Sequence, residues 1–329
     1  MKRMMSQIVM GGLLLTFLLG STGAFGQGEL FPVKPINMYV GYPPGGTTVI
    51  TGQITAEGMK KYLNQPVVLN FKPGAVQAIA TEFVKNSKPD GYTIAYLAHG
   101  NLIAKLAKDK RDGVPLKFLI DDLEPLGAGP YSPFTVAVNA DSPYKTVEDF
   151  VAAARKSPGS LNYGPDGIGT CGHLLMELFS QKAGITMSNI PFQGGGPAIT
   201  ALLGGHVQII TYSVTALGAH IKPGGGLRPL MVFDNKRDPS LPDVPTASER
   251  GFDLSLSTWQ GLRAPKGLPK PVRDSLVQAF EKAMKDPQIL QMLAKLDCSV
   301  NFLNPEETEK QSQAEYKLFL EVWEQIGKK

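Results

Sequence analysis

The stretch INMYVGYPPGGTTVI, residues 36–50, decides how the chain folds. An apolar run from Ile36 to Tyr42 is typical of a buried strand, and Pro-Pro-Gly-Gly then ends it. A helical pattern follows through Leu63. Glycine in such a turn lets backbone approach a ligand, and the first turn of a helix offers unpaired N–H groups to an anion. The stretch therefore predicts a strand, a turn suited to binding an anion, and a helix.

The same alternation continues along the chain. Further strands are expected at 67–71, 92–97, 134–138, 161–163, 207–212 and 227–233. Helices are expected at 78–84, at 146–156 with Thr146 and Asp149 as a capping box, and at 271–285, 287–296 and 305–326. This order predicts an α/β fold with a mostly parallel sheet and helices on both faces. Ligands of such sheets bind beyond the carboxyl ends of the strands.

Two more Gly-rich turns follow predicted strands and open predicted helices. They are GPDGIGT at 164–170 and QGGGP at 193–197. None of the three turns has the lysine of a phosphate-binding loop or the full dinucleotide spacing. A single turn of this kind is more often plain turn chemistry, but three together favour a small anion held by backbone groups. Thr47, Thr48 and Thr170 add hydroxyl groups that can donate to a carboxylate.

The N-terminus has the features of an export signal. Lys2 and Arg3 precede an apolar run at 8–19, and Ala24-Phe25-Gly26 then offers small residues at the positions that a signal peptidase reads. The run is shorter than the ~20 residues of a spanning helix, which argues against a membrane anchor. We expect residues 1–26 to be a signal peptide cleaved near Gly26, leaving a protein that is free in the periplasm.

Composition argues against several classes of protein. With 43% hydrophobic and 19% charged residues, the 329-residue chain suits a packed protein of about two domains. Lysine and arginine are scattered and the net charge is +4, so we expect no nucleic-acid partner. His206 and His220 lack metal-ligand spacing with any cysteine, so we expect no metal site.

Motifs in a fixed order cover nearly all of the chain after the signal peptide. They are FPVKPINMYVGYPPGGTT at 31–48, NQPVVLNFKPGA at 64–75, KPDGYTIAYL at 88–97, SPYKTVEDFVAAAR at 142–155, YGPDGIGTCGHLLMELF at 163–179, PFQGGGPAITALLGGHVQI at 191–209, LRPLMVFDNKRDPSLPDVPTASERGF at 227–252 and WQGLRAPKGLPKPV at 259–272. Together they resemble the substrate-binding component of tripartite tricarboxylate transporters, the TctC or Bug family.

The resemblance implies a two-domain α/β fold of the periplasmic-binding-protein type, a type II Venus flytrap with two interdomain crossings. Domain one would comprise 31–132 plus 258–329, and domain two 133–257. The protein would be a monomer that closes on a small organic acid and delivers it to integral membrane transporter subunits. Binding by hinge closure needs no cofactor, and none is expected. Carried over by position, the ligand-binding residues are Tyr42, Gly45, Gly46, Thr47, Thr48, Asp166, Gly167, Gly169, Thr170, Gln193, Gly194 and Gly195.

Three positions depart from the family pattern and leave the ligand open. Val49 stands where the family often has an Asp that meets an ammonium or hydroxyl group, which argues against an amino-acid ligand. Asp166 lies in a loop that usually carries small hydroxyl residues, and it either selects a hydroxyl or amine on the ligand or points to solvent. Gln208 replaces another usual Asp.

Several other residues need an interpretation. Cys171 and His173 would suit a nucleophile and its base, but two positions apart on a helix they do not share a face. We expect no catalysis; an exported Cys-dependent hydrolase and a ligand sensor for a signalling receptor remain alternatives. Export permits a disulfide between Cys171 and Cys298, although it would restrict domain motion. His99 either lines the cleft or lies in a solvated loop, and Trp259 is assigned to packing.

Overall fold

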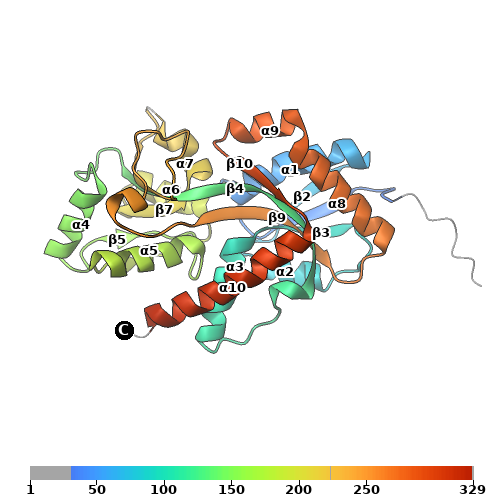
Figure 1. Cartoon of the computed structure of the whole chain (residues 1–329), viewed down its shortest axis with the longest axis horizontal. Helices are drawn as coiled ribbons and strands as arrows, with labels where there is room; N and C mark the ends of the chain where they lie inside the picture. The colour runs from blue at the N-terminus through green and yellow to red at the C-terminus, as the bar shows by residue number, and fades with distance from the viewer. Residues whose placement is uncertain (1–30, 223, 328–329) are drawn as a thin grey trace, which may run out of the picture.

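The structure is a computed structural model that describes residues 31–222 and 224–327. Its strands are β1 (Ile36–Val40), β2 (Val67–Phe71), β3 (Thr93–Ala98), β4 (Leu123–Asn139), β5 (Asn162–Tyr163), β6 (Ser188–Asn189), β7 (Ile209–Ser213), β8 (Leu227–Phe233), β9 (Ser257–Pro265) and β10 (Ser299–Leu303). Its α-helices are α1 (Thr47–Leu63), α2 (Ala78–Lys85), α3 (His99–Arg111), α4 (Val147–Lys156), α5 (Cys171–Ala183), α6 (Gly195–Leu203), α7 (Val214–Ile221), α8 (Lys270–Lys285), α9 (Pro287–Ala294) and α10 (Pro305–Gly327). Figure 1 shows two α/β lobes joined by long strands.

We call lobe one the part built from β1–β3, α1–α3 and α8–α10. Its first three strands pair in parallel in the order β2-β1-β3. Helix α1 follows β1 directly and packs against α8 and α9. The turn at 41–46 therefore lies at the carboxyl edge of this sheet, as the opening sequence predicts.

We call lobe two the part built from α4–α7 and β5–β8. Strands β6, β5 and β7 pair in parallel. Helix α4 begins at the predicted capping box: the Asp149 N–H donates to Thr146 Oγ1 at 3.1 Å, and the Thr146 N–H donates to the Asp149 carboxylate at 2.9 Å. The turns before α5 and α6 lie at the carboxyl edge of this sheet and face lobe one.

Strands β4 and β9 link the two lobes. Strand β4 pairs with β9 over Leu123–Pro133 and with β7 and β8 over Phe134–Asn139, always antiparallel. It therefore changes partners between Pro133 and Phe134, and it joins both halves into one 10-stranded sheet. In Figure 1, β4 in green and β9 in orange run side by side from one lobe to the other.

The lobes also touch beside the crossing strands. Phe319 and Trp323 of α10 belong to the same buried cluster as Leu174 of α5. The Trp323 ring lies 5.3 Å from the ring of His173 on α5. Apolar packing between α10 and α5 therefore holds the lobes together in this conformation.

The sheet corrects one expectation. Strands 67–71 and 227–233 have the predicted bounds, and the helices after 270 begin and end close to the predicted residues. A mostly parallel sheet is wrong, because among residues 31–222 and 224–327 five of the nine strand pairs are antiparallel. The antiparallel pairs all involve the crossing strands β4 or β9, most of whose length was not predicted.

Candidate ligand-binding site

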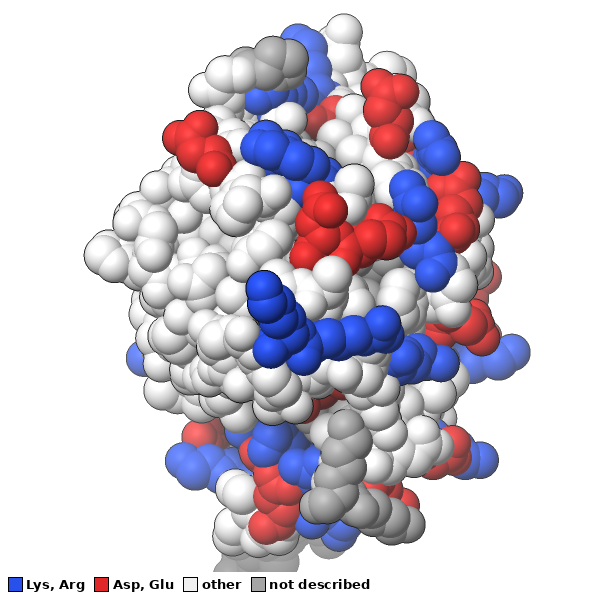
Figure 2. All heavy atoms as spheres, turned by 90° about the vertical axis from the view of Figure 1, so that its left-hand side faces the viewer, with Lys and Arg blue, Asp and Glu red and all other residues white. Residues whose placement is uncertain are grey.

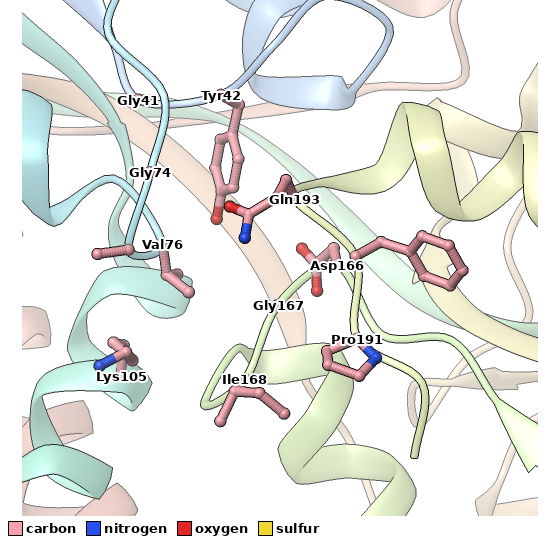
Figure 3. A pocket seen from close by; sticks show the side chains of 12 residues that line it. Gly41, Tyr42, Gly74, Val76, Lys105, Asp166, Gly167, Ile168, Pro191 and Gln193 are labelled. Atoms are coloured by element: carbon pink, nitrogen blue, oxygen red, sulfur yellow. The ribbon is translucent and has the colours of Figure 1, made fainter. Parts of the chain in front are cut away.

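A cavity of about 190 Å³ lies between the two lobes (Figure 3). Its lobe-one wall consists of Gly41, Tyr42, Gly74, Ala75, Val76 and Lys105. Its lobe-two wall consists of Asp166, Gly167, Ile168, Pro191, Phe192 and Gln193. The loops that form these walls follow β1, β2, β5 and β6. The cavity therefore lies beyond the carboxyl ends of the parallel strands, where α/β sheets bind ligands.

Asp166 is the acidic group of this cavity. Its side chain is only 2% exposed, and Figure 3 shows its carboxylate pointing into the cavity beside Gln193. Oδ2 accepts a hydrogen bond from Asn101 Nδ2 at 3.0 Å, whereas the buried Oδ1 has no hydrogen-bond partner. Burial raises the pKa of Asp166 to about 6, because desolvation disfavours the charged form.

Asn101 connects this carboxylate to both lobes. It lies in the first turn of α3, and its Nδ2 also donates to the Tyr42 hydroxyl oxygen at 3.2 Å. Its Oδ1 accepts from the Cys171 N–H at 3.0 Å, at the start of α5 in lobe two. The residue was not predicted, although its place just after the carboxyl end of β3 is the signal that could have found it.

Tyr42 and Gln193 supply neutral donors. Because the Tyr42 oxygen accepts from Asn101, its own proton is free to donate to a ligand. Burial, and after it the negative charge of Asp166, raises the pKa of Tyr42 well above its usual value, so the hydroxyl stays protonated. Figure 3 shows the Gln193 amide beside the Tyr42 hydroxyl, between that ring and Asp166.

A left-handed turn forms the rest of the lobe-one wall. Ala75, Val76 and Gln77 have φ values of 47°, 50° and 70°, a conformation that costs roughly 1–2 kcal/mol for each non-glycine residue. The fully buried Gln77 side chain holds the turn. Its amide donates to the Ala98 carbonyl at 3.0 Å and accepts from the Ala98 N–H at 2.9 Å. This wall was also not predicted.

Lys105 is the cation among the lining residues that the structure describes. Its Nζ pairs with Asp109 one helical turn along α3. Figure 3 shows its side chain directed away from Asp166. The described cavity therefore combines one carboxylate with neutral hydrogen-bonding groups.

Comparison with known proteins identifies the relatives of this site and fold. Residues 51–327 match the family described as "Tripartite tricarboxylate transporter family receptor", TctC. The chain belongs to the TctC receptor family. A curated relative from Cupriavidus necator, "UPF0065 protein in gbd 5'region", is 36% identical over 290 residues, which cover 88% of this chain and 86% of the relative.

Solved structures show the same architecture. The periplasmic binding protein BugD is 28% identical, with a TM-score of 0.81 over 90% of this chain and 99% of that structure. MatC from Rhodopseudomonas palustris, solved with bound malate, is 24% identical, with a TM-score of 0.81 over 89% of this chain and 100% of that structure. The two-domain periplasmic-binding-protein fold expected of this TctC receptor is thus confirmed.

The Gly-rich turns at 43–48 and 193–197 of this TctC receptor meet each other across the lobes. A Cβ on Gly196 would lie 3.0 Å from the Pro44 carbonyl oxygen, and one on Gly46 would lie 2.8 Å from the Tyr212 hydroxyl. Thr47 Oγ1 is hydrogen-bonded to Ser213 Oγ. Of the predicted residues, Gly45, Gly46, Thr47, Thr48, Gly194 and Gly195 lie at this contact or behind it and do not line the 190 Å³ cavity.

The turn before α5 contributes both wall and support. Asp166 and Gly167 line the cavity, whereas Thr170 caps α5 by accepting from the His173 N–H at 3.2 Å. The Gly169 N–H donates to His173 Nδ1 at 2.9 Å. The hydroxyl of Thr170 is therefore occupied by the chain itself.

His99 and Trp259 form part of the buried framework of this receptor. His99 is fully buried, stacks on the Trp259 ring at 4.5 Å and accepts from Arg263 Nε at 3.1 Å. Both expectations for His99, a cleft position and a solvated loop, are wrong. Trp259 packs as expected, and its Nε1 donates to Glu315 at 2.8 Å.

The cysteines, the surface and the helices each bear on a sequence prediction. Cys171 and Cys298 are free and buried, so no disulfide joins them. On the face drawn in Figure 2, basic and acidic side chains lie interspersed. Over 31–222 and 224–327, no helix has both the length and the apolar character that a membrane span requires. The expected signal peptide at 1–26 lies outside the described residues.

Proposed function

We propose that this protein is an exported, monomeric solute-binding protein that captures a small organic acid between its lobes and hands it to the membrane subunits of a tripartite tricarboxylate-type transporter. One observation carries the proposal: loops of both lobes form the walls of a single cavity beyond the carboxyl ends of their strands. A ligand there contacts both lobes at once. Because those contacts are complete only when the lobes are together, binding shifts the population toward the closed form.

The hinge of this motion lies in β4 and β9. We place it where β4 exchanges β9 for β7 and β8, at Pro133 and Phe134, and where β9 begins at Ser257. Lobe one then corresponds to 31–132 plus 258–329, and lobe two to 133–257. Bending at two adjacent strands is a hinge motion. Opening the lobes also separates Phe319 and Trp323 of α10 from Leu174 of α5, which belong to one buried cluster.

The cavity suits a ligand of a few carbon atoms. Its volume of about 190 Å³ is well above the ~10–15 Å³ that one bound water requires on the same measure, so it admits a small molecule. The Tyr42 hydroxyl and the Gln193 amide offer donors to a carboxylate. The family description as a tricarboxylate transporter receptor supports an organic acid. The malate-bound relative shares only the fold at its level of identity, so the choice of acid rests on this chain.

A binding role fits the chemistry of Cys171 better than a hydrolytic one. The thiol is fully buried, and burial raises its pKa well above the usual value. A nucleophile needs the thiolate and a base within hydrogen-bonding reach. His173 Nδ1 is instead engaged by the Gly169 N–H.

A thermal-shift screen of the chain from Gln27 onward tests the proposal. The panel contains mono-, di- and tricarboxylic acids of three to six carbons, with matched amides as controls. A true ligand adds about 2.7 kcal/mol of stability at 100 times its Kd, so the melting temperature rises and saturates. A cooperative melt that no acid shifts would contradict the proposal, as would turnover of an acid during the assay.

A further inference from the structure

The cavity carries a feature that a site for a plain carboxylate would avoid. Its buried ionisable group is Asp166, and its lining cation, Lys105, is paired with Asp109. The carboxylate of a ligand placed here would be repelled by the negative charge of Asp166, and no lining cation is free to offset that repulsion. If the protein binds an organic acid here, as proposed above, Asp166 decides which acids the site accepts.

One oxygen of Asp166 is held and the other is left over. Asn101 Nδ2 donates to Oδ2, and the same amide is fixed by the Cys171 N–H and the Tyr42 hydroxyl. The Thr170 hydroxyl and the N–H of Asp166 itself lie near the carboxyl group and lower its pKa, but neither meets Oδ1 with hydrogen-bond geometry, and the Thr170 hydroxyl donates to the Gly167 carbonyl at 3.0 Å. Oδ1 therefore remains a buried acceptor with no donor from the described chain.

A buried acceptor without a donor costs roughly 1–3 kcal/mol, and more when it is charged. Natural proteins keep few such groups, and a ligand that supplies the missing donor is one reason to keep one. The surrounding residues hold Oδ2 in place and leave Oδ1 without a donor. A carboxylate held in this way can distinguish ligands by whether they supply that donor. Since burial holds the pKa of Asp166 at about 6, the carboxyl group is mainly ionised at neutral pH and acts as an acceptor.

We propose that Asp166 Oδ1 accepts a hydrogen bond from a donor on the bound acid, so that the protein selects hydroxy or amino acids over acids that lack such a donor. The carboxylate of the ligand is then held by Tyr42 and Gln193. The hydroxyl or ammonium group next to it faces Asp166.

Titration calorimetry with matched acids tests this selection. The probes are three sets that differ in one substituent: propionate, lactate and alanine; succinate, malate and aspartate; glutarate, 2-hydroxyglutarate and glutamate. We expect the hydroxyl or the ammonium member of one set to bind at least about tenfold more tightly than its plain acid, which corresponds to about 1.4 kcal/mol. Comparing those two members identifies which donor Asp166 prefers.

The variant Asp166→Asn sharpens the test. Asn101 needs an acceptor at the Oδ2 position, so the new amide places its oxygen there and its NH₂ where Oδ1 stood. The acceptor that faces the ligand becomes a donor. We expect the ratio of affinities for the hydroxy or amino acid over the plain acid to fall at least about tenfold. The variant should then favour the plain acid or the matching keto acid. Asp253 is exposed, so Asp253→Asn is the matched control, and we expect it to keep the wild-type order of affinities.

The outcomes separate the two proposals. A plain acid that binds as tightly as its hydroxy and amino partners, in both wild type and Asp166→Asn, overturns the selection by Asp166 but leaves acid binding intact. No binding to any member of the three sets, or to the wider panel, overturns the proposed function itself. If Asp166→Asn does not fold, Asn101→Leu, which frees Oδ2, replaces it and is expected to weaken the same preference.

Discussion

The carboxyl group of Asp166 lies where burial removes water, while the surrounding chain supplies hydrogen bonds to one of its oxygens only. An acid with a raised folded-state pKa holds its proton more tightly in the folded than in the unfolded state. Its contribution to stability therefore falls as the pH rises from about 4 to about 6, and stays low above that.

We predict that Asp166→Asn stabilises the ligand-free protein at pH 8. The amide carries no charge to desolvate and still accepts from Asn101, whereas its NH₂ takes the buried place of Oδ1 at a cost of its own, so the free energy of unfolding should increase by about 1–2 kcal/mol. At pH 4.5 the wild-type carboxyl is mostly protonated, and the difference should shrink. Urea unfolding followed by circular dichroism at both pH values measures this, with Asp253→Asn as the control.

A variant that is less stable than wild type at pH 8 would contradict the prediction that the buried charge of Asp166 is the larger cost. Greater stability together with an altered ligand preference would mark Asp166 as a residue kept for function. A purely structural residue does not give that combination.

The sequence located part of this site. Asp166, Tyr42 and Gln193 were predicted, because each belongs to a strand-to-helix turn with conspicuous glycine or proline. Asn101 and Gln77 were not, because each acts through one side chain within an ordinary stretch. Their roles depend on the Cys171 N–H and on Ala98, partners far away in the sequence.

At the scale of elements, the Gly-rich turns do open helices α1, α5 and α6, as their composition predicts. Composition did not indicate which turn residues line the cavity and which contact the turn of the other lobe. The first and third turns press against each other, with Gly196 close to the Pro44 carbonyl oxygen. These glycines permit the lobes to approach, which is a different use of the same small size.

We predict that Gly196→Ala weakens ligand binding without loss of stability. A Cβ there lies 3.0 Å from Pro44 O in the other lobe, so it opposes closure. In the helix itself, Ala in place of Gly stabilises by roughly 0.5–1 kcal/mol. Calorimetric titration should show a several-fold rise in Kd, while the ligand-free melting temperature stays the same or increases.

Unchanged affinity in Gly196→Ala would show that the contact between these turns is not part of the bound state. A lowered melting temperature would instead show a packing defect within lobe two. The Kd and the melting temperature are measured on the same sample, so an effect on lobe closure is distinguished from an effect on folding.

Strand β9 shows why some elements escaped prediction. Its residues are almost all buried, but Gln260 and Arg263 interrupt the apolar pattern on which strand prediction depends. Arg263 tolerates burial because it donates to His99, Ser312, Glu309 and two backbone carbonyls. Those partners come from three separate parts of the chain, so no local signal marks the strand.

At the scale of the whole molecule, two lobes that share β4 and β9 form one cavity between them. The alternating strands and helices predicted the α/β class, and the family resemblance implied two crossings. The point at which β4 changes its partner strands depends on pairing between distant parts of the chain, so only the structure shows it. The central claim is that this interlobe cavity is where an organic acid binds.

The measurement that tests this claim most directly is a titration of two tryptophan variants with the acid that gives the largest thermal shift. Ile168 lines the cavity and Ile190 does not, yet both side chains are 39% exposed and both lie in lobe two. We predict that Ile168→Trp fills the cavity and weakens binding at least about tenfold, which is 1.4 kcal/mol or more. Ile190→Trp should bind like wild type. Equal and undiminished affinity in both variants would place the ligand elsewhere and contradict the account.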